Sequence, residues 1–172
     1  MKKIYLSVVC LLISIPLIAQ LYVEPEKEVE CSVFLAKEGR GRAQQGLEIW
    51  DDYIFSCEDG GHVNIYDFKS ADPKPVAGFE LASSHPDNHV NNVCFGVETK
   101  RGASFPLLYI TNGKVGSELE WLCFVESITR RGKRFSSEIA QTIELDGSKW
   151  AEKGYVPIFG APSWLVDRER GF

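Results

Sequence analysis

Between residues 46 and 145 the chain consists of short runs of β-favouring residues separated by turn residues, and this pattern limits the possible folds most strongly. Clusters of Gly, Asp, Asn and Pro end the runs, as is typical of strands joined by turns. In the stretch Glu58–Gly61, Glu-Asp-Gly-Gly, glycine supplies the positive φ that a tight hairpin needs. The first unit therefore contains four predicted strands, over Gly46–Trp50, Tyr53–Cys57, His62–Phe68 and Val76–Leu81.

The same four-strand pattern recurs further along the chain. Matching runs are found at Val90–Gly96, Phe105–Gly113, Glu120–Ser127 and Ala140–Leu145, and a third unit begins at Gly160. Helical periodicity is nearly absent, since even the end of the stretch 136–145 alternates as a strand does. A period of roughly 40–55 residues with four strands per unit is typical of β-propeller blades.

The residues from Gln45 to Phe68, QGLEIWDDYIFSCEDGGHVNIYDF, resemble the opening blade of the secreted YVTN-like or quinoprotein-like β-propellers of bacteria. The resemblance implies an all-β fold, a partial β-propeller of four-stranded antiparallel blades. Blade one would cover about residues 43–81, blade two about 89–145, and the start of a third about 160–172. The Trp-Asp pair at Trp50 lies at the end of the first strand rather than the third, so we do not assign the WD40 family.

The first twenty residues have the features of a secretory signal peptide. Lys2 and Lys3 precede an almost wholly apolar run, Ile4–Ile18, and Ala19 provides a small residue for cleavage. The alternative is a membrane anchor, but the run is shorter than the roughly 20 residues that a spanning helix needs. We therefore expect an exported protein, in the periplasm, at the cell surface or secreted, with no membrane span after cleavage.

The ends of the chain predict that it is the N-terminal part of a longer propeller. Residues 21–42 contain one isolated strand pattern, Cys31–Leu35, of the kind that closes a ring against a last blade. The pattern of the third unit breaks off at Phe172. Two blades alone would leave unpaired edges and apolar faces, which native proteins avoid.

Charge and cysteine usage exclude some classes of protein. The net charge is −5 and no basic stripe is present, so we expect no nucleic-acid partner. The cysteines after the signal peptide show no Cys-x-x-Cys spacing, which leaves buried thiols or one disulfide as alternatives: Cys31, Cys57, Cys94 and Cys123. Cys94 and Cys123 are predicted on the first and third strands of one blade, too far apart to bridge.

The stretch His85–Gly96, HPDNHVNNVCFG, is the candidate functional site. Pro86 and the turn formers after it predict a loop, so the spacing of the two histidines carries no helical metal-site geometry. We assign no catalytic residue, metal or cofactor. By the resemblance, the loop would lie at the mouth of the central channel, and the candidate ligand-binding residues are His85, Asp87, His89, Asn91, Asn92 and Gln45. The alternative is a structural role, in which these polar groups satisfy the backbone.

These features together favour an exported β-propeller binding or scaffold module whose ligand is an unknown protein or carbohydrate. One alternative is a propeller-type hydrolase or lyase with a channel-mouth His/Asp site, possibly metal-dependent. Another is a β-sandwich carbohydrate-binding domain. The basic run Thr129–Arg134 is interpreted as a solvated hairpin tip between third and fourth strands rather than an anion site.

Overall fold

The computed structural model describes residues 43–72, 74–114, 116–145, 151–154 and 163–171. These residues belong to one compact unit, 33–172. The predicted signal peptide, the segment 21–42 with its closing strand, Cys31 and residues 160–162 lie outside the described residues.

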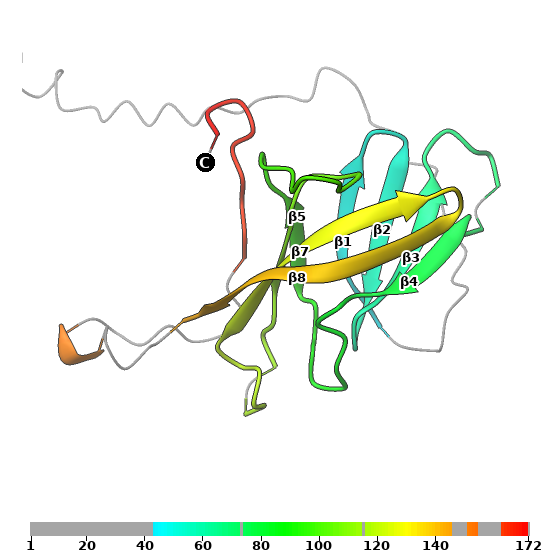
Figure 1. Cartoon of the computed structure of the whole chain (residues 1–172). Helices are drawn as coiled ribbons and strands as arrows, with labels where there is room; N and C mark the ends of the chain where they lie inside the picture. Colours follow the sequence, from blue (N-terminus) through cyan, green and yellow to red (C-terminus); the bar gives the residue numbers. More distant parts are fainter. Residues whose placement is uncertain (1–42, 73, 115, 146–150, 155–162, 172) are drawn as a thin grey trace, which may run out of the picture. The chain divides into compact units, whose positions relative to one another are not determined.

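The first sheet is formed by four consecutive strands in antiparallel order β1-β2-β3-β4 (Figure 1). Its strands are β1 (Gln44–Trp50), β2 (Tyr53–Glu58), β3 (His62–Asp67) and β4 (Ala77–Glu80). The turn between β2 and β3 uses Gly60 and Gly61 at φ values of 90° and 95°, which confirms the predicted hairpin.

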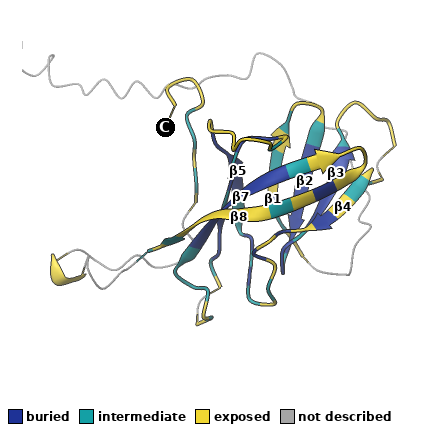
Figure 2. Cartoon of the chain, in the orientation of Figure 1, coloured by how far each residue is buried: buried dark blue, intermediate teal, exposed yellow. Residues whose placement is uncertain are grey.

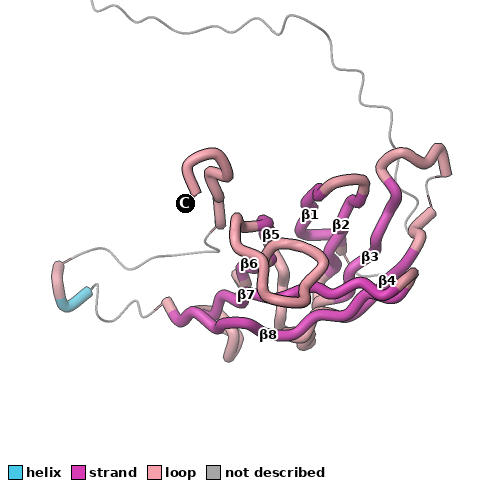
Figure 3. Tube along the Cα trace, turned by 45° about the horizontal axis from the view of Figure 1, so that its top comes forward, coloured by secondary structure: helices cyan, strands magenta, loops and turns pink. Residues whose placement is uncertain are grey.

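The second sheet repeats this arrangement in the order β5-β6-β7-β8, and Figure 3 shows the strands of each sheet following one another along the chain. Its strands are β5 (Asn92–Phe95), β6 (Leu108–Thr111), β7 (Leu122–Arg131) and β8 (Arg134–Glu144). The predicted all-β class is therefore confirmed as two four-stranded antiparallel sheets.

The main difference from the prediction is the length of the β7–β8 hairpin. Its strands extend through the basic run to Arg131 and from Arg134, leaving only a short turn at which Gly132 has a φ of 63°. The strands continue because Ile128 and Phe135 point inward and are buried, while Arg131 and Arg134 point to the opposite face and are exposed. Of the predicted third unit, residues 163–171 contain no strand and end in a turn.

An aromatic cluster joins the two sheets. Phe55 on β2 makes edge contacts with Phe95 on β5 and with Phe105, with ring centroids 5.0 and 5.1 Å apart. Phe135 on β8 stacks against Phe79 on β4 at 6.0 Å. The residues of the main core cluster come from both sheets, and β8 is largely exposed (Figure 2). Each fully buried aromatic ring adds about 1.5–3 kcal/mol to the free energy of unfolding, so this cluster is a principal source of stability.

The described cysteines agree with the prediction. Cys94 lies on β5 and Cys123 on β7, with β6 between them, and both are free thiols, as is Cys57 on β2. All three are buried. Within the described part of the chain, no helix has the length and apolar character needed to cross a bilayer.

Candidate functional site

Three loops from both sheets meet at one end of the strands. In two antiparallel sheets of consecutive strands, the β2–β3, β4–β5 and β6–β7 connections all lie at the same end. These connections, residues 59–61, 81–91 and 112–121, are called the loop face below. The backbone N–H of Gly60 donates to the carbonyl of Asn88 at 2.7 Å, which ties the first of these loops to the second.

The side chain of Asn88 stabilises the loop 81–91 through hydrogen bonds within the loop. Its fully buried side-chain amide donates to the carbonyl and the hydroxyl of Ser83, at 2.9 and 3.1 Å. Its Oδ1 accepts from the N–H of Val90 at 3.2 Å, a local bond that asparagine forms readily in turns. The sequence therefore folds this loop back on itself around one satisfied amide.

Asn112 connects the loop 81–91 to the loop 112–121. Its buried Oδ1 accepts from the N–H of His89 at 2.9 Å, and its Nδ2 donates to the carbonyl of Leu119 at 2.7 Å. The sequence predicts only that Asn112 and Gly113 end the run Phe105–Gly113. In the structure, the Asn112 side chain also links two loops of the loop face and so sets the distance between them.

Val90 has a strained backbone in the middle of the predicted site. Its φ is 42° although the side chain is β-branched and fully buried, a conformation that costs about 1–3 kcal/mol. Its carbonyl lies against β1, where a Cβ on Gly46 would come within 3.1 Å of the oxygen. The close approach requires glycine at position 46, and it brings the start of β1 next to the start of β5.

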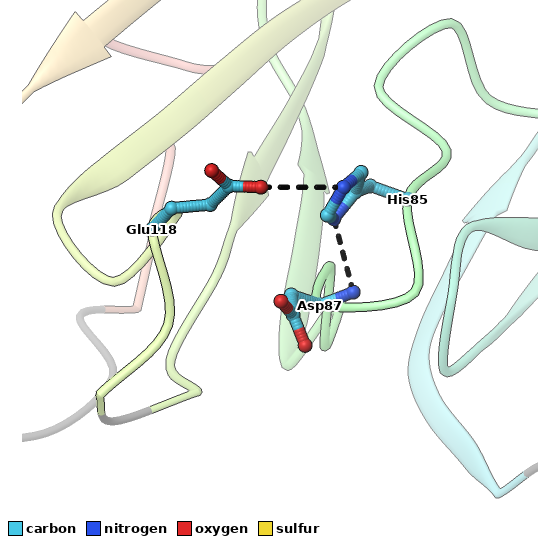
Figure 4. A group of neighbouring side chains, drawn as sticks. All are labelled: His85, Asp87 and Glu118. Atoms are coloured by element: carbon cyan, nitrogen blue, oxygen red, sulfur yellow. Dashed lines mark hydrogen bonds and ion pairs between the residues drawn. The ribbon is translucent and has the colours of Figure 1, made fainter.

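His85, Asp87 and Glu118 form a cluster on the loop face (Figure 4). One ligand-type atom from each lies within 4.8 Å of the others. His85 Nε2 is 3.4 Å from Glu118 Oε1, and the backbone N–H of Asp87 donates to His85 Nδ1 at 3.1 Å. Lys114 pairs with the Asp87 carboxylate, and this bond lowers the pKa of that carboxyl group below its ordinary value.

The hydrogen bonds fix which imidazole nitrogen of His85 carries the proton. Nδ1 accepts from the Asp87 N–H, so in the neutral ring the proton is on Nε2, which lies 3.4 Å from Glu118 Oε1. A metal ion on Nε2 would need the proton on Nδ1, against the Asp87 N–H. The cluster thus combines the imidazole of His85, the ammonium group of Lys114, and two carboxylates. This set of groups suits a polar ligand better than a metal ion.

His89 lies apart from His85. Its Nε2 is 3.9 Å from Asp59 Oδ1, on the β2–β3 loop of the first sheet. The structure therefore brings His85 and Asp87 together but places His89 at the junction between the sheets. The two histidines do not form one site, as the predicted loop conformation already indicated.

Asn92 begins β5, Asn91 directly precedes it, and Gln45 lies near the start of β1. Asn91 donates its backbone N–H to the carbonyl of Thr111 at 3.1 Å, and its buried Oδ1 has no hydrogen-bond partner in the described part of the chain. Asn92 Oδ1 accepts from the N–H of Trp164 at 2.8 Å. Gln45 is the extra residue of a β-bulge, since Gln44 and Gly46 are paired with successive residues of β2.

The sequence does not indicate which residues of other loops contact the loop 81–91. Glu118 and Lys114 lie on the β6–β7 connection, and Lys114 is 27 residues from the aspartate that it pairs with. No local spacing signals such a contact. Only the correct pairing of strands, which places the loops at one end, could have identified them.

The side chain of Arg168 links polar groups of β1 and β5. Its guanidinium lies 4.9 Å from the centroid of the Trp50 ring and donates to Glu48 Oε1 at 3.2 Å and to the carbonyl of Phe95 at 3.3 Å. Glu48 Oε2 in turn accepts from the N–H of Phe95 at 3.3 Å. One arginine thus links the segment 163–171 to β1 and β5 together.

The function of these surfaces is inferred from the geometry of the residues that form them. No protein-family model, no curated protein and no solved structure matches this chain.

Proposed function

We propose that this chain forms two neighbouring blades of an exported β-propeller-type binding or scaffold module, with the loop face as its ligand surface. The observation that carries the proposal is the way the sheets meet. The innermost strand β1 contacts the innermost strand β5, and the outermost strand β4 contacts the outermost strand β8. Adjacent blades of a propeller have this contact pattern.

The segment 163–171 supports the same arrangement. Trp164 and Arg168 hydrogen-bond to Asn92 and Phe95, at the two ends of β5. The segment therefore lies along β5. In a propeller, the first strand of a third blade would lie next to β5, on the side that faces away from β1. The ring of Trp164 packs edge-on against Tyr109 of β6, with the centroids 5.5 Å apart.

Burial on both faces of the first sheet favours blades over a two-layer sandwich. Phe55 and Ile65 are paired across β2 and β3 and belong to the core between the sheets. The next pair, Ile54 and Tyr66, points to the opposite face and is also buried. A sandwich sheet exposes one face to water, whereas a propeller blade is covered on both.

The loop face has the chemistry of a preformed recognition surface for a polar ligand, a protein or a carbohydrate. Its charged groups are held by one another, Asp87 by Lys114 and Glu118 by His85, so little ordering remains to be done on binding. Asn88 and Asn112 fix the backbone beneath them. This arrangement favours binding over the hydrolase or lyase alternative, which would need a group poised to attack a substrate.

A glycan array probed with the full chain tests the proposal. The double variant Asp87→Asn, Lys114→Met removes the ion pair on the loop face, and Lys100→Met is the matched control because Lys100 pairs with Glu138 away from that face. We expect the double variant to lose signals that the control keeps. Equal signals in all three proteins would contradict a loop-face site, and release of reducing ends from a bound glycan would favour the enzyme alternative.

A further inference from the structure

The outward face of the β7–β8 hairpin carries an unusual set of cross-strand pairs. The register of the two strands places Ser127 opposite Glu138, Thr129 opposite Ser136, and Arg131 opposite Arg134. Residues directly opposite each other in an antiparallel pair point to the same side of the sheet. Two hydroxyl-bearing pairs and an arginine pair therefore follow one another along a single face.

This face borders an open cavity of about 540 Å³. A cavity of this size is in the range that holds a small organic ligand. The residues around it come from one hairpin: Ser127, Thr129, Arg131, Arg134, Phe135, Ser136, Ser137 and Glu138. The site therefore stays intact as long as this hairpin is formed.

The arginine pair places two like charges directly opposite each other on neighbouring strands. Like charges directly opposite each other on neighbouring strands destabilise the pairing. Both Arg131 and Arg134 are exposed, and among the described residues neither forms an ion pair. An anion between them would remove the repulsion and accept hydrogen bonds from both guanidinium forks.

The hydroxyl-bearing residues next to the arginines line the same cavity. Ser127 is 1 % exposed and lines the cavity, and within the described chain neither its hydroxyl nor those of Thr129 and Ser136 makes a hydrogen bond. A hydroxyl both donates and accepts, so a row of them matches the hydroxyls of a sugar ring. Glu138, at the far end of the row, is paired with Lys100 at 2.9 Å, so its charge is partly offset.

The inward face holds the hairpin in place. The guanidinium of Arg130 lies 4.9 Å from the centroid of the Tyr53 ring, and Phe135 packs into the aromatic cluster between the sheets. Ser137 accepts from the N–H of Ala82 at 2.8 Å. The outward pairs are thus presented on a rigid ribbon, which is the condition for preorganised binding.

We propose that this face of the β7–β8 hairpin binds a sugar bearing a phosphate or sulfate ester. The oxyanion lies between Arg131 and Arg134, and the sugar hydroxyls face Ser127, Thr129 and Ser136. The arginine end of the site lies at the end of the second sheet opposite the loop face, because the β6–β7 and β7–β8 connections are at opposite ends of β7. The two sites are independent, and either can be present without the other.

Isothermal titration of the full chain with glucose 6-phosphate, glucose 6-sulfate, glucose and inorganic phosphate tests the proposal. We expect one of the two esters to bind, with glucose or inorganic phosphate alone about ten-fold weaker or more. The double variant Arg131→Gln, Arg134→Gln should weaken binding of the ester about ten-fold or more, since charge-assisted hydrogen bonds are lost. Lys133→Gln is the control, because it removes one positive charge from the turn between the two arginines and Lys133 does not line the cavity.

A second measurement separates binding from a merely structural role. Without ligand, the arginine double variant should melt at the same or a higher temperature than the wild type, because the repulsion is gone. The proposal is overturned if neither ester binds at millimolar concentration, or if the double variant binds as the wild type does. If inorganic phosphate binds as tightly as the esters, the hairpin binds an oxyanion without recognising a sugar, and the proposal of a sugar ligand is wrong.

Discussion

The carboxylate of Glu126, on β7 of the second sheet, accepts a 2.8 Å hydrogen bond from the backbone N–H of Ser83, which is 43 residues earlier in the chain. Its other oxygen accepts from the N–H of Ala82 at 2.9 Å. Glu126 is fully buried. A side chain of one sheet thus holds the start of the loop that leaves the other sheet, and this loop carries His85 and Asp87.

Replacing Glu126 by alanine should lower the free energy of unfolding by about 2 kcal/mol, because the buried N–H of Ser83 is left without an acceptor. Glu126→Gln should cost less, since its amide oxygen still accepts one of the two N–H groups. Urea denaturation of the full chain measures both values. Glu138→Ala removes an exposed carboxylate of the same hairpin and should change stability by less than about 1 kcal/mol. A similar loss in both alanine variants would contradict the role given to Glu126.

Gly61→Ala should destabilise the protein more than Gly102→Ala does. Both glycines have φ near 90°, so both substitutions carry the cost of a left-handed backbone, about 1–2 kcal/mol. A Cβ on Gly61 would also lie 2.8 Å from the Cα of Ser84, whereas nothing lies within 4 Å of one on Gly102. The difference between the two variants, about 1–3 kcal/mol by urea denaturation, measures this steric clash. Equal losses would show that the contact between the β2–β3 turn and the loop 81–91 is absent in solution.

The stability of the protein should fall as the pH rises above about 9. Burial, and secondarily the charge of Glu126, raises the pKa of the Cys57 thiol well above its ordinary value of 9.0. The unfolded chain releases this proton at lower pH than the folded chain, so stability is full below pH 9 and decreases above it, by up to about 1.4 kcal/mol per pH unit for each such thiol. Burial also raises the pKa of Cys94 and Cys123.

Cys57→Ala isolates the contribution of Cys57 to this pH dependence. Urea denaturation at a series of pH values from 7 to 10.5 should give a shallower decline for the variant, by about one proton. The same slope for both proteins would mean that Cys57 ionises in the folded state as readily as in the unfolded one.

Arg168→Ala should release the segment 163–171 from the inner strands. The substitution removes two hydrogen bonds and the stacking on Trp50, so amide hydrogen exchange in this segment should become faster, which mass spectrometry of its peptides detects. Arg170→Ala is the control, because within the described residues the Arg170 side chain pairs with its near neighbour Asp167, at 3.6 Å. Unchanged exchange in Arg168→Ala would show that other contacts, such as that of Trp164 with Asn92, are sufficient.

Much of the fold could be predicted from the sequence because its strands are local. Within each sheet, every strand pairs with the next along the chain, and turn residues such as Gly60 and Gly61 mark where the chain reverses. The ends of β7 and β8 were harder to predict. There the charged residues from Arg130 to Arg134 resemble a loop in composition, and only the inward position of Phe135 shows that the strand continues.

The candidate site was predictable only in part. The stretch 85–92 stood out by composition, and its position between an outer and an inner strand followed from the repeat. Its partners did not, since Glu118, Lys114 and Asp59 reach it from loops that are distant in sequence. The strained φ of Val90 carries no sequence signal either, because valine is an unfavourable residue for that conformation.

The order of the strands has a consequence for synthesis on the ribosome. The first sheet has all of its strand partners once residue 80 has been translated, so its hairpins can close while the second sheet is still being made. The amides of Ala82 and Ser83 must then remain solvated until Glu126 emerges. Assembly is thus expected to proceed from the N-terminal sheet to the C-terminal one. The carboxylate of Glu126 can bind the amides of Ala82 and Ser83 only after the first half of β7 has been made.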